Sequence, residues 1–193
     1  MYQTLLGSSN FFALLLRFDE DLAVQAREVG CACGGVLHSA RYARKPRGGP
    51  EGLGPKHAMR LSFCCSVEGC RRRVTPPSLR FLGRKVFFGV VVVLLPVLRE
   101  GPTPQRLRRL TEAFEVSPRT LQRWRQWWRE VVPRSRFWEA RRGRFALPVA
   151  IESLPGSLLA AFSESAEPSE RVLLVLHWLS PLTTGQGLCG GCF

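Results

Sequence analysis

Residues 103–133 read TPQRLRRLTEAFEVSPRTLQRWRQWWREVVP and predict two short helices joined by a tight turn. The second helix begins at Ser117-Pro118, and Thr103-Pro104 repeats this start signal for the first. A Ser or Thr side chain accepts a hydrogen bond from an unpaired backbone N–H at a helix start, and Pro in the first turn loses no hydrogen bond. Both helices therefore have a physical reason to begin where the sequence places them.

The two faces of the second helix differ in chemistry. At about 100° per residue, one face carries Ser117, Leu121, Trp124 and Trp128, and the other carries Arg119, Gln122, Arg123, Gln126 and Glu130. In the first helix the matching apolar stripe is Leu107, Leu110 and Phe114. Packing of the two stripes leaves an Arg/Gln face outward, which suits the major groove, where Arg grips guanine and Gln grips adenine.

The sequence thus predicts a helix-turn-helix whose second helix reads duplex DNA. The residues expected to contact DNA are Arg119, Thr120, Gln122, Arg123 and Gln126. The alternative is a two-helix hairpin whose charged face is only solvated.

Charge is concentrated in the middle of the chain. Of 28 Lys and Arg residues, 25 lie within 41–144, together with 7 of the 15 Asp and Glu, a net charge of +18 for that segment. Both ends are mildly acidic. A basic centre indicates a polyanion partner. Arg71, Arg72 and Arg73 are expected to lie near the DNA backbone, where contacts supply affinity and register but no sequence information.

The cysteines predict a structural metal site. CACGG at 31–35 and FCCSVEGC at 63–70 are two Cys-containing turns with glycines that free the backbone to bend around sulfur. Four thiolates complete the coordination of Zn²⁺ in a tetrahedral, non-catalytic site. The predicted ligands are Cys31, Cys33, Cys65 and Cys70, and Cys64, His38 or His57 could replace one of them. Buried thiols without a metal are the alternative.

The remaining segments predict a mainly α fold with a small β zinc ribbon. The expected units are an N-terminal amphipathic helix (1–29), the ribbon with its basic loop (30–78), a three-helix helix-turn-helix (79–133), a basic arm (134–147), a C-terminal helical unit (148–183) and a tail (184–193). The amphipathic helix itself is expected over residues 9–29. It should bury Leu14, Leu15, Phe18, Leu22 and Ala26, direct Asp19 to solvent and stop at a left-handed Gly30.

The apolar run 86–98 is too short to cross a bilayer, and we expect it to form the buried first helix of the three, although four consecutive Val also suit a strand.

Phe137 and Trp138 lie in an Arg-rich segment that would form an arm along nucleic acid or cover the neighbouring core. Cys189 and Cys192 have the spacing of a metal or redox pair near the chain end.

The layout resembles the front part of bacterial insertion-sequence transposases and their small accessory proteins. The residues that carry the resemblance are CACGG at 31–35, FCCSVEGCRRR at 63–73 and SPRTLQRWRQWW at 117–128, so about residues 30–130 are covered. The resemblance implies binding to transposon ends or regulation, with a transposase or recombinase encoded nearby as a partner. The departures are a tight first Cys pair and the lack of a catalytic domain.

No enzymatic motif stands out. Metal-assisted phosphodiester chemistry needs clustered carboxylates, and Asp occurs only at 19 and 21. We therefore expect a non-enzymatic DNA-binding protein with structural Zn²⁺. It should be cytoplasmic and nucleoid-associated, without membrane association. A homodimer is one option for its oligomeric state. An RNA-binding zinc-ribbon protein and an adaptor for a recombinase are the alternatives.

Overall fold

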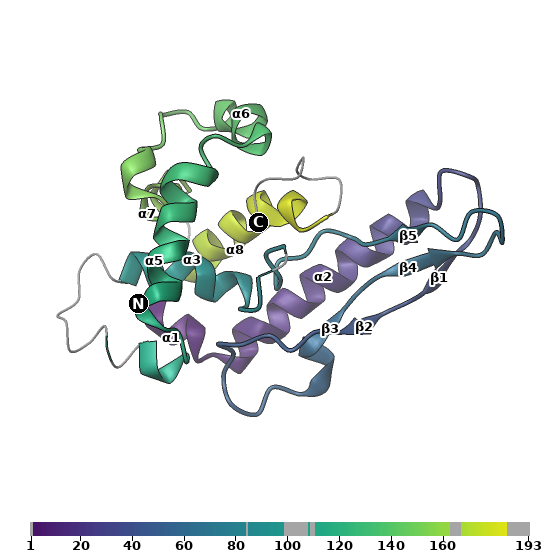
Figure 1. Ribbon diagram of the computed structural model, residues 1–193, viewed down its shortest axis with the longest axis horizontal. Coiled ribbons are helices and arrows are strands. Elements are labelled where there is room, and N and C mark those ends of the chain that lie inside the picture. The colour runs from purple at the N-terminus through teal and green to yellow at the C-terminus, as the bar shows by residue number, and fades with distance from the viewer. Residues whose placement is uncertain (1, 84, 99–107, 109–110, 163–166, 185–193) are drawn as a thin grey trace.

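The computed structural model describes residues 2–83, 85–98, 108, 111–162 and 167–184 (Figure 1). The chain is mainly helical and has a few short strands, as the sequence predicts. In order, the elements are α1 (Tyr2–Leu6), α2 (Ser9–Val29), β1 (Leu37–Ser39), β2 (Tyr42–Ala43), η1 (Pro55–Ala58), β3 (Met59–Arg60), β4 (Phe63–Cys65), β5 (Arg73–Val74), α3 (Gly89–Leu98), α5 (Pro118–Gln126), the π-helical turn η2 (Trp127–Val131), α6 (Arg136–Arg141), η3 (Arg142–Arg144), η4 (Ile151–Ser153), α7 (Gly156–Ala161), α8 (Pro168–Leu179) and η5 (Ser180–Thr183).

The long helix α2 joins two regions. We call residues 31–78 the ribbon, and α1, α3 and α5–α8 with their connections the helical body. In Figure 1, α2 runs from the body to the far end of the ribbon. Its start is capped by the Ser8 hydroxyl, which accepts from the Phe11 N–H at 3.2 Å. The predicted bounds are confirmed, and Gly30 follows with φ +75°, although its ψ of −166° lies outside the left-handed helical region.

The polar side of α2 was predicted wrongly. Asp19 is 1 % exposed, whereas Phe18 is 36 % exposed. Asp19 accepts from the Ser78 hydroxyl at 2.5 Å, the Leu79 N–H at 2.6 Å and Arg80 Nε at 2.8 Å. Arg80, itself fully buried, also donates to backbone carbonyls between residues 56 and 59. The Asp19 carboxylate therefore connects α2 with residues 78–80 and, through Arg80, with the segment 56–59.

The helical body packs around α3. The run Val90–Leu95 is fully buried, which explains why four β-branched residues occur in a helix: it is apolar on all sides because its neighbours cover all sides. The helix begins at Gly89, three residues later than the apolar run. Trp128 donates from its indole N–H to the Val92 carbonyl at 3.1 Å, which ties η2 to α3.

The predicted basic arm is instead helical and packed. Ser135 caps α6 by accepting from the Trp138 N–H. Phe137 and Trp138 are buried, and both rings contact Trp178 of α8, with ring centroids 4.6 Å and 5.8 Å apart. The core-covering alternative is therefore the correct one. The C-terminal helical unit predicted for 148–183 contains η4, α7, α8 and η5, and α8 shares the core of the body.

The ribbon has two small antiparallel sheets, one ordered β1-β4-β5 and one formed by β2 and β3. In the first, His38 pairs with Cys64 and Cys64 with Arg73. Alternation along β4 buries Phe63 and Cys65 and turns Cys64 to the opposite face. The buried face has a small apolar core: Ala23 of α2, Cys31, Leu37, Leu61, Phe63 and Cys65.

Helices able to span a membrane are not found within the described ranges, because none combines sufficient length with apolar character.

Candidate metal centre and nucleic-acid interface

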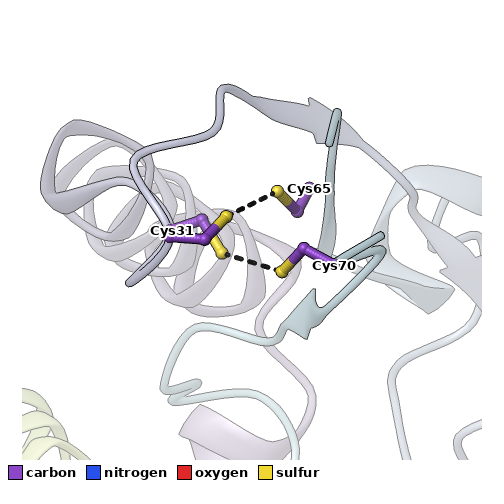
Figure 2. A group of neighbouring side chains, drawn as sticks. Cys31, Cys65 and Cys70 are labelled. Carbon is purple, nitrogen blue, oxygen red and sulfur yellow. Dashed lines mark hydrogen bonds between the residues drawn. The ribbon is translucent and has the colours of Figure 1, made fainter. Parts of the chain in front are cut away.

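Four cysteines meet at the end of the ribbon. Cys31 directly follows the Gly30 cap of α2, Cys33 lies in the next turn, Cys65 ends β4, and Cys70 lies in the turn before β5. Their sulfur atoms all lie within 4.8 Å of one another. Figure 2 shows Cys31, Cys65 and Cys70 directed toward a common point. The four residues predicted as ligands are thus brought together by the fold.

The spacing of the sulfur atoms fits a tetrahedral metal. Metal–sulfur bonds of about 2.3 Å imply S···S separations of about 3.8 Å. The Cys31–Cys70 distance is 3.7 Å and the Cys33–Cys65 distance is 3.4 Å. Both are far longer than the S–S bond of about 2.05 Å in a disulfide. The arrangement can hold a metal ion.

Backbone N–H groups surround the sulfur atoms. The Gly35 N–H, with the neighbouring thiols, lowers the pKa of Cys33 to about 7. The Val67 N–H acts to lower the pKa of Cys65, but burial and the other thiols outweigh it and raise that pKa to about 12. For Cys70 the Arg72 N–H also acts downward, yet the thiols of Cys33 and Cys31 and burial raise the pKa. One thiolate forms readily, and further ones need a cation.

Gly35 is required by the closeness of the sulfur atoms. A Cβ at this position would lie 2.5 Å from Cys65 Sγ and 2.7 Å from a methyl group of Val67. Only glycine lets the turn after Cys33 approach Cys65 so closely. The preceding Gly34, with φ +80°, supplies the turn itself.

The alternative ligands lie elsewhere. Cys64 Sγ is 3.5 Å from the Arg71 carbonyl, on the other face of β4. His38 is exposed on that same face, and His57 is buried in η1 with Nδ1 3.2 Å from the Gly54 carbonyl. Among the described residues, the cluster that can hold a metal comprises Cys31, Cys33, Cys65 and Cys70. Cys189 and Cys192 fall outside the described residues.

The predicted reading helix, α5, buries Leu121 and Trp124 and exposes Arg119, Gln122, Arg123 and Gln126. Its cap forms as predicted, with the Ser117 hydroxyl accepting from the Thr120 N–H at 3.2 Å. Two of the predicted contacts have local partners. The Thr120 hydroxyl lies 2.9 Å from that of Ser117, and the Gln126 amide donates to Glu130 at 3.0 Å.

The first helix of the predicted pair is described in part. Arg108 and 111–113 are helical, whereas Thr103, Leu107 and Leu110 fall outside the described residues. Phe114 is partly buried against the core, and Glu115 makes the turn with φ +51°. The packing of α5 on α3 is therefore seen, but the full helix-turn-helix arrangement stays a prediction.

Two further features concern charge. Arg71, Arg72 and Arg73 are exposed at the ribbon end, which Figure 1 places opposite α5 along the long axis.

Lys85 was not predicted from the sequence as part of this region, because only the fold brings it near α5. Its ammonium lies 4.4 Å from the Trp127 ring centroid. Burial, and then the charge of Arg123, lower the pKa of Lys85 to about 8.

Comparisons with protein families, with curated proteins and with solved structures gave no match to this chain.

Proposed function

We propose that this chain is a non-enzymatic DNA-binding protein of mobile-element type that reads duplex DNA through α5 and binds a structural Zn²⁺. The observation that carries the proposal is the exposed face of α5. Arg119, Gln122 and Arg123 project from a short helix whose opposite face is fixed by Leu121 and Trp124 in the core. Arg and Gln on a rigid helix match the donor and acceptor pattern of base edges.

Zinc is the metal favoured by the donor set. Four thiolates without an open position suit a structural tetrahedral site, and soft sulfur ligands disfavour Mg²⁺ and Ca²⁺. An iron–sulfur centre uses the same donors, and visible absorbance with metal analysis of the purified protein separates the two. The metal would fix the turns that precede Arg71, Arg72 and Arg73.

Binding to mixed-sequence duplex DNA, followed by fluorescence anisotropy at several salt concentrations, tests the proposal. Neutralising phosphates releases counterions, so log K should fall steeply and linearly with log salt. The double variant R119Q/R123Q should weaken binding, whereas the slope, which phosphate contacts set, should change little. The matched control R17Q/R27Q, on the exposed side of α2, should leave both unchanged.

Two outcomes would redirect the proposal. Stronger competition by structured RNA than by duplex DNA would favour the RNA-binding alternative. A salt-insensitive or absent interaction, with capture of a recombinase instead, would favour the adaptor. Either result, with the metal content unchanged, would leave the cysteine site intact and remove the role of α5.

A further inference from the structure

The two long sides of the molecule carry opposite charge. The exposed charged residues of α2 are Arg17, Glu20, Asp21, Arg27 and Glu28, a net charge of −1. One face of the sheet packs on α2. The other face, called the outer face, is directed away from α2. On the outer face lie His38 and Arg73, with Arg41, Arg71 and Arg72 exposed nearby in sequence. Polyanions are therefore favoured on the sheet side and disfavoured on the α2 side.

The basic loop after β2 is fixed to the helical body. The Arg47 N–H donates to the Val86 carbonyl at 2.8 Å, and the Phe88 N–H donates to the Arg47 carbonyl at 3.1 Å. Gly48 and Gly49 lie so close to Val91 and Phe88 that a Cβ would stand within 3 Å of either side chain. The backbone at Arg47 is thus fixed between the ribbon and the body, and the side chains of Lys45 and Arg47 are exposed there.

A groove connects this loop with the start of α5. It has a volume of about 670 Å³ and lies between residues 44–58 and residues 113–115, which lead directly into the Ser117 cap. Arg44, Lys45 and Arg47 line it, together with Glu51 and Glu115. The cations of the groove lie on its loop side, and Glu115 lies on the side next to α5.

The length of α2 is close to one turn of DNA. With 21 residues at about 1.5 Å each, α2 spans about 30 Å. One turn of B-DNA measures about 34–36 Å. At this separation, well beyond a Debye length of about 8 Å, the two ends act on DNA as separate charges.

We propose that one duplex lies along the sheet side, with α5 in its major groove, Lys45 and Arg47 on the intervening backbone, and Arg71, Arg72 and Arg73 on phosphates about one helical turn away. This inference rests on the proposed function of α5. It adds that the protein covers DNA asymmetrically: the contacted DNA extends beyond the α5 site only on the side of the ribbon. The position of Arg73 is supported by a cation–π contact, because its guanidinium is 5.7 Å from the ring centroid of Tyr42 in β2.

The test compares duplexes of about 12 and about 30 base pairs, since the shorter covers little more than one turn. The ribbon variant R71Q/R72Q/R73Q should weaken binding to the long duplex and reduce its salt slope by about 3, and should bind the short duplex as the unaltered protein does. K45Q/R47Q should reduce the slope by about 2. The control R17Q/R27Q should change neither, and metal content and circular dichroism verify that each variant folds.

Three results would overturn the inference. An equal loss on both duplexes would place the ribbon Arg residues within the α5 site. No loss on either would remove them from the interface. Capture of a second, labelled duplex on bead-bound DNA, abolished by the ribbon variant, would mean that the two ends bridge two duplexes. If the unaltered protein binds neither duplex, the proposed function of α5 fails first.

Discussion

The ribbon and the helical body are stabilised in different ways. The body buries a large apolar core around α3, which includes Trp124, Trp128, Trp138 and Trp178. The small apolar core of the ribbon has six buried residues, of which one is Ala23 of α2 and two are cysteines of the cluster. Apolar burial contributes roughly 25 cal/mol per Å², so the ribbon gains little from packing alone. From this comparison we expect the body to fold by apolar burial and the ribbon to depend on a bound metal.

Metal removal should have the largest effect and should act on the ribbon alone. Binding of structural zinc contributes about 10–16 kcal/mol in isolated zinc-finger peptides. With a chelator, or in Cys65→Ser, amides that close the ribbon should exchange with solvent. These include the Cys65 N–H, bonded to Arg72, and the Ser66 N–H, bonded to Val36. Hydrogen exchange should leave the Val92 N–H of α3 protected.

The matched variant for this experiment is Cys64→Ser. Its thiol lies on the other face of β4, so metal binding and amide protection should persist. Equal loss of protection in ribbon and body after chelation would break the distinction between the two regions.

Asp19→Asn should destabilise both regions together. It weakens the acceptor for the buried Arg80, and removing one partner of a buried ion pair typically costs about 3–5 kcal/mol. Urea denaturation followed by tryptophan fluorescence measures the change. The control Asp21→Asn alters an exposed carboxylate and should stay within about 0.5 kcal/mol. A shift confined to ribbon amides would mean that the carboxylate does not connect the regions.

Gly35→Ala should weaken metal binding and leave the body unchanged. The added methyl group would collide with Cys65 Sγ and Val67, and disturbance around metal ligands typically costs about 10-fold to 100-fold in affinity. Competition with a chromophoric chelator gives the value. Gly69→Ala is the matched control, because a Cβ there meets nothing within 4 Å. Similar losses in both variants would refute the steric explanation.

The smallest effect concerns Cys33 in that part of the metal-free protein in which the turns around the cysteines are still closed. Because its pKa is lowered to about 7, the thiolate predominates above that pH and its reaction with iodoacetamide should fall as pH decreases through 7. Peptide mapping by mass spectrometry measures the rate, with Cys33→Ser as the blank. Added metal should suppress the reaction. An unchanged rate with metal would exclude Cys33 from the ligands.

Local signals were sufficient for several features. The bounds of α2, the Ser117 cap and the four clustered cysteines follow from residues that are near one another in sequence or share a strict chemical requirement. A helix cap involves residues within one helical turn. Two closely spaced pairs of cysteines that flank short strands are typical of a metal site. Such features can be predicted because their partners are local or chemically distinctive.

Features that depend on distant partners were not predictable. Asp19 was assigned to solvent because its partner Arg80 lies 61 positions away, and the helix wheel alone favours a charged residue outside. Trp138 looked available for nucleic acid until Trp178 covered it. The four Val residues suit a strand locally, and only their neighbours on all sides make them helical. Tertiary contacts decided each case.

The adjacent thiols in β4 have a consequence for assembly. A slip of this strand by one residue would present Cys64 where Cys65 belongs and turn Phe63 toward water, since side chains alternate across a strand. If the cysteines bind metal, an ion supplied to the unfolded chain would meet Cys64 and Cys65 equally and could trap the shifted pairing. An ion supplied after the sheet has formed would meet only Cys65, so we expect the order of folding and metal binding to set the yield of correctly paired protein.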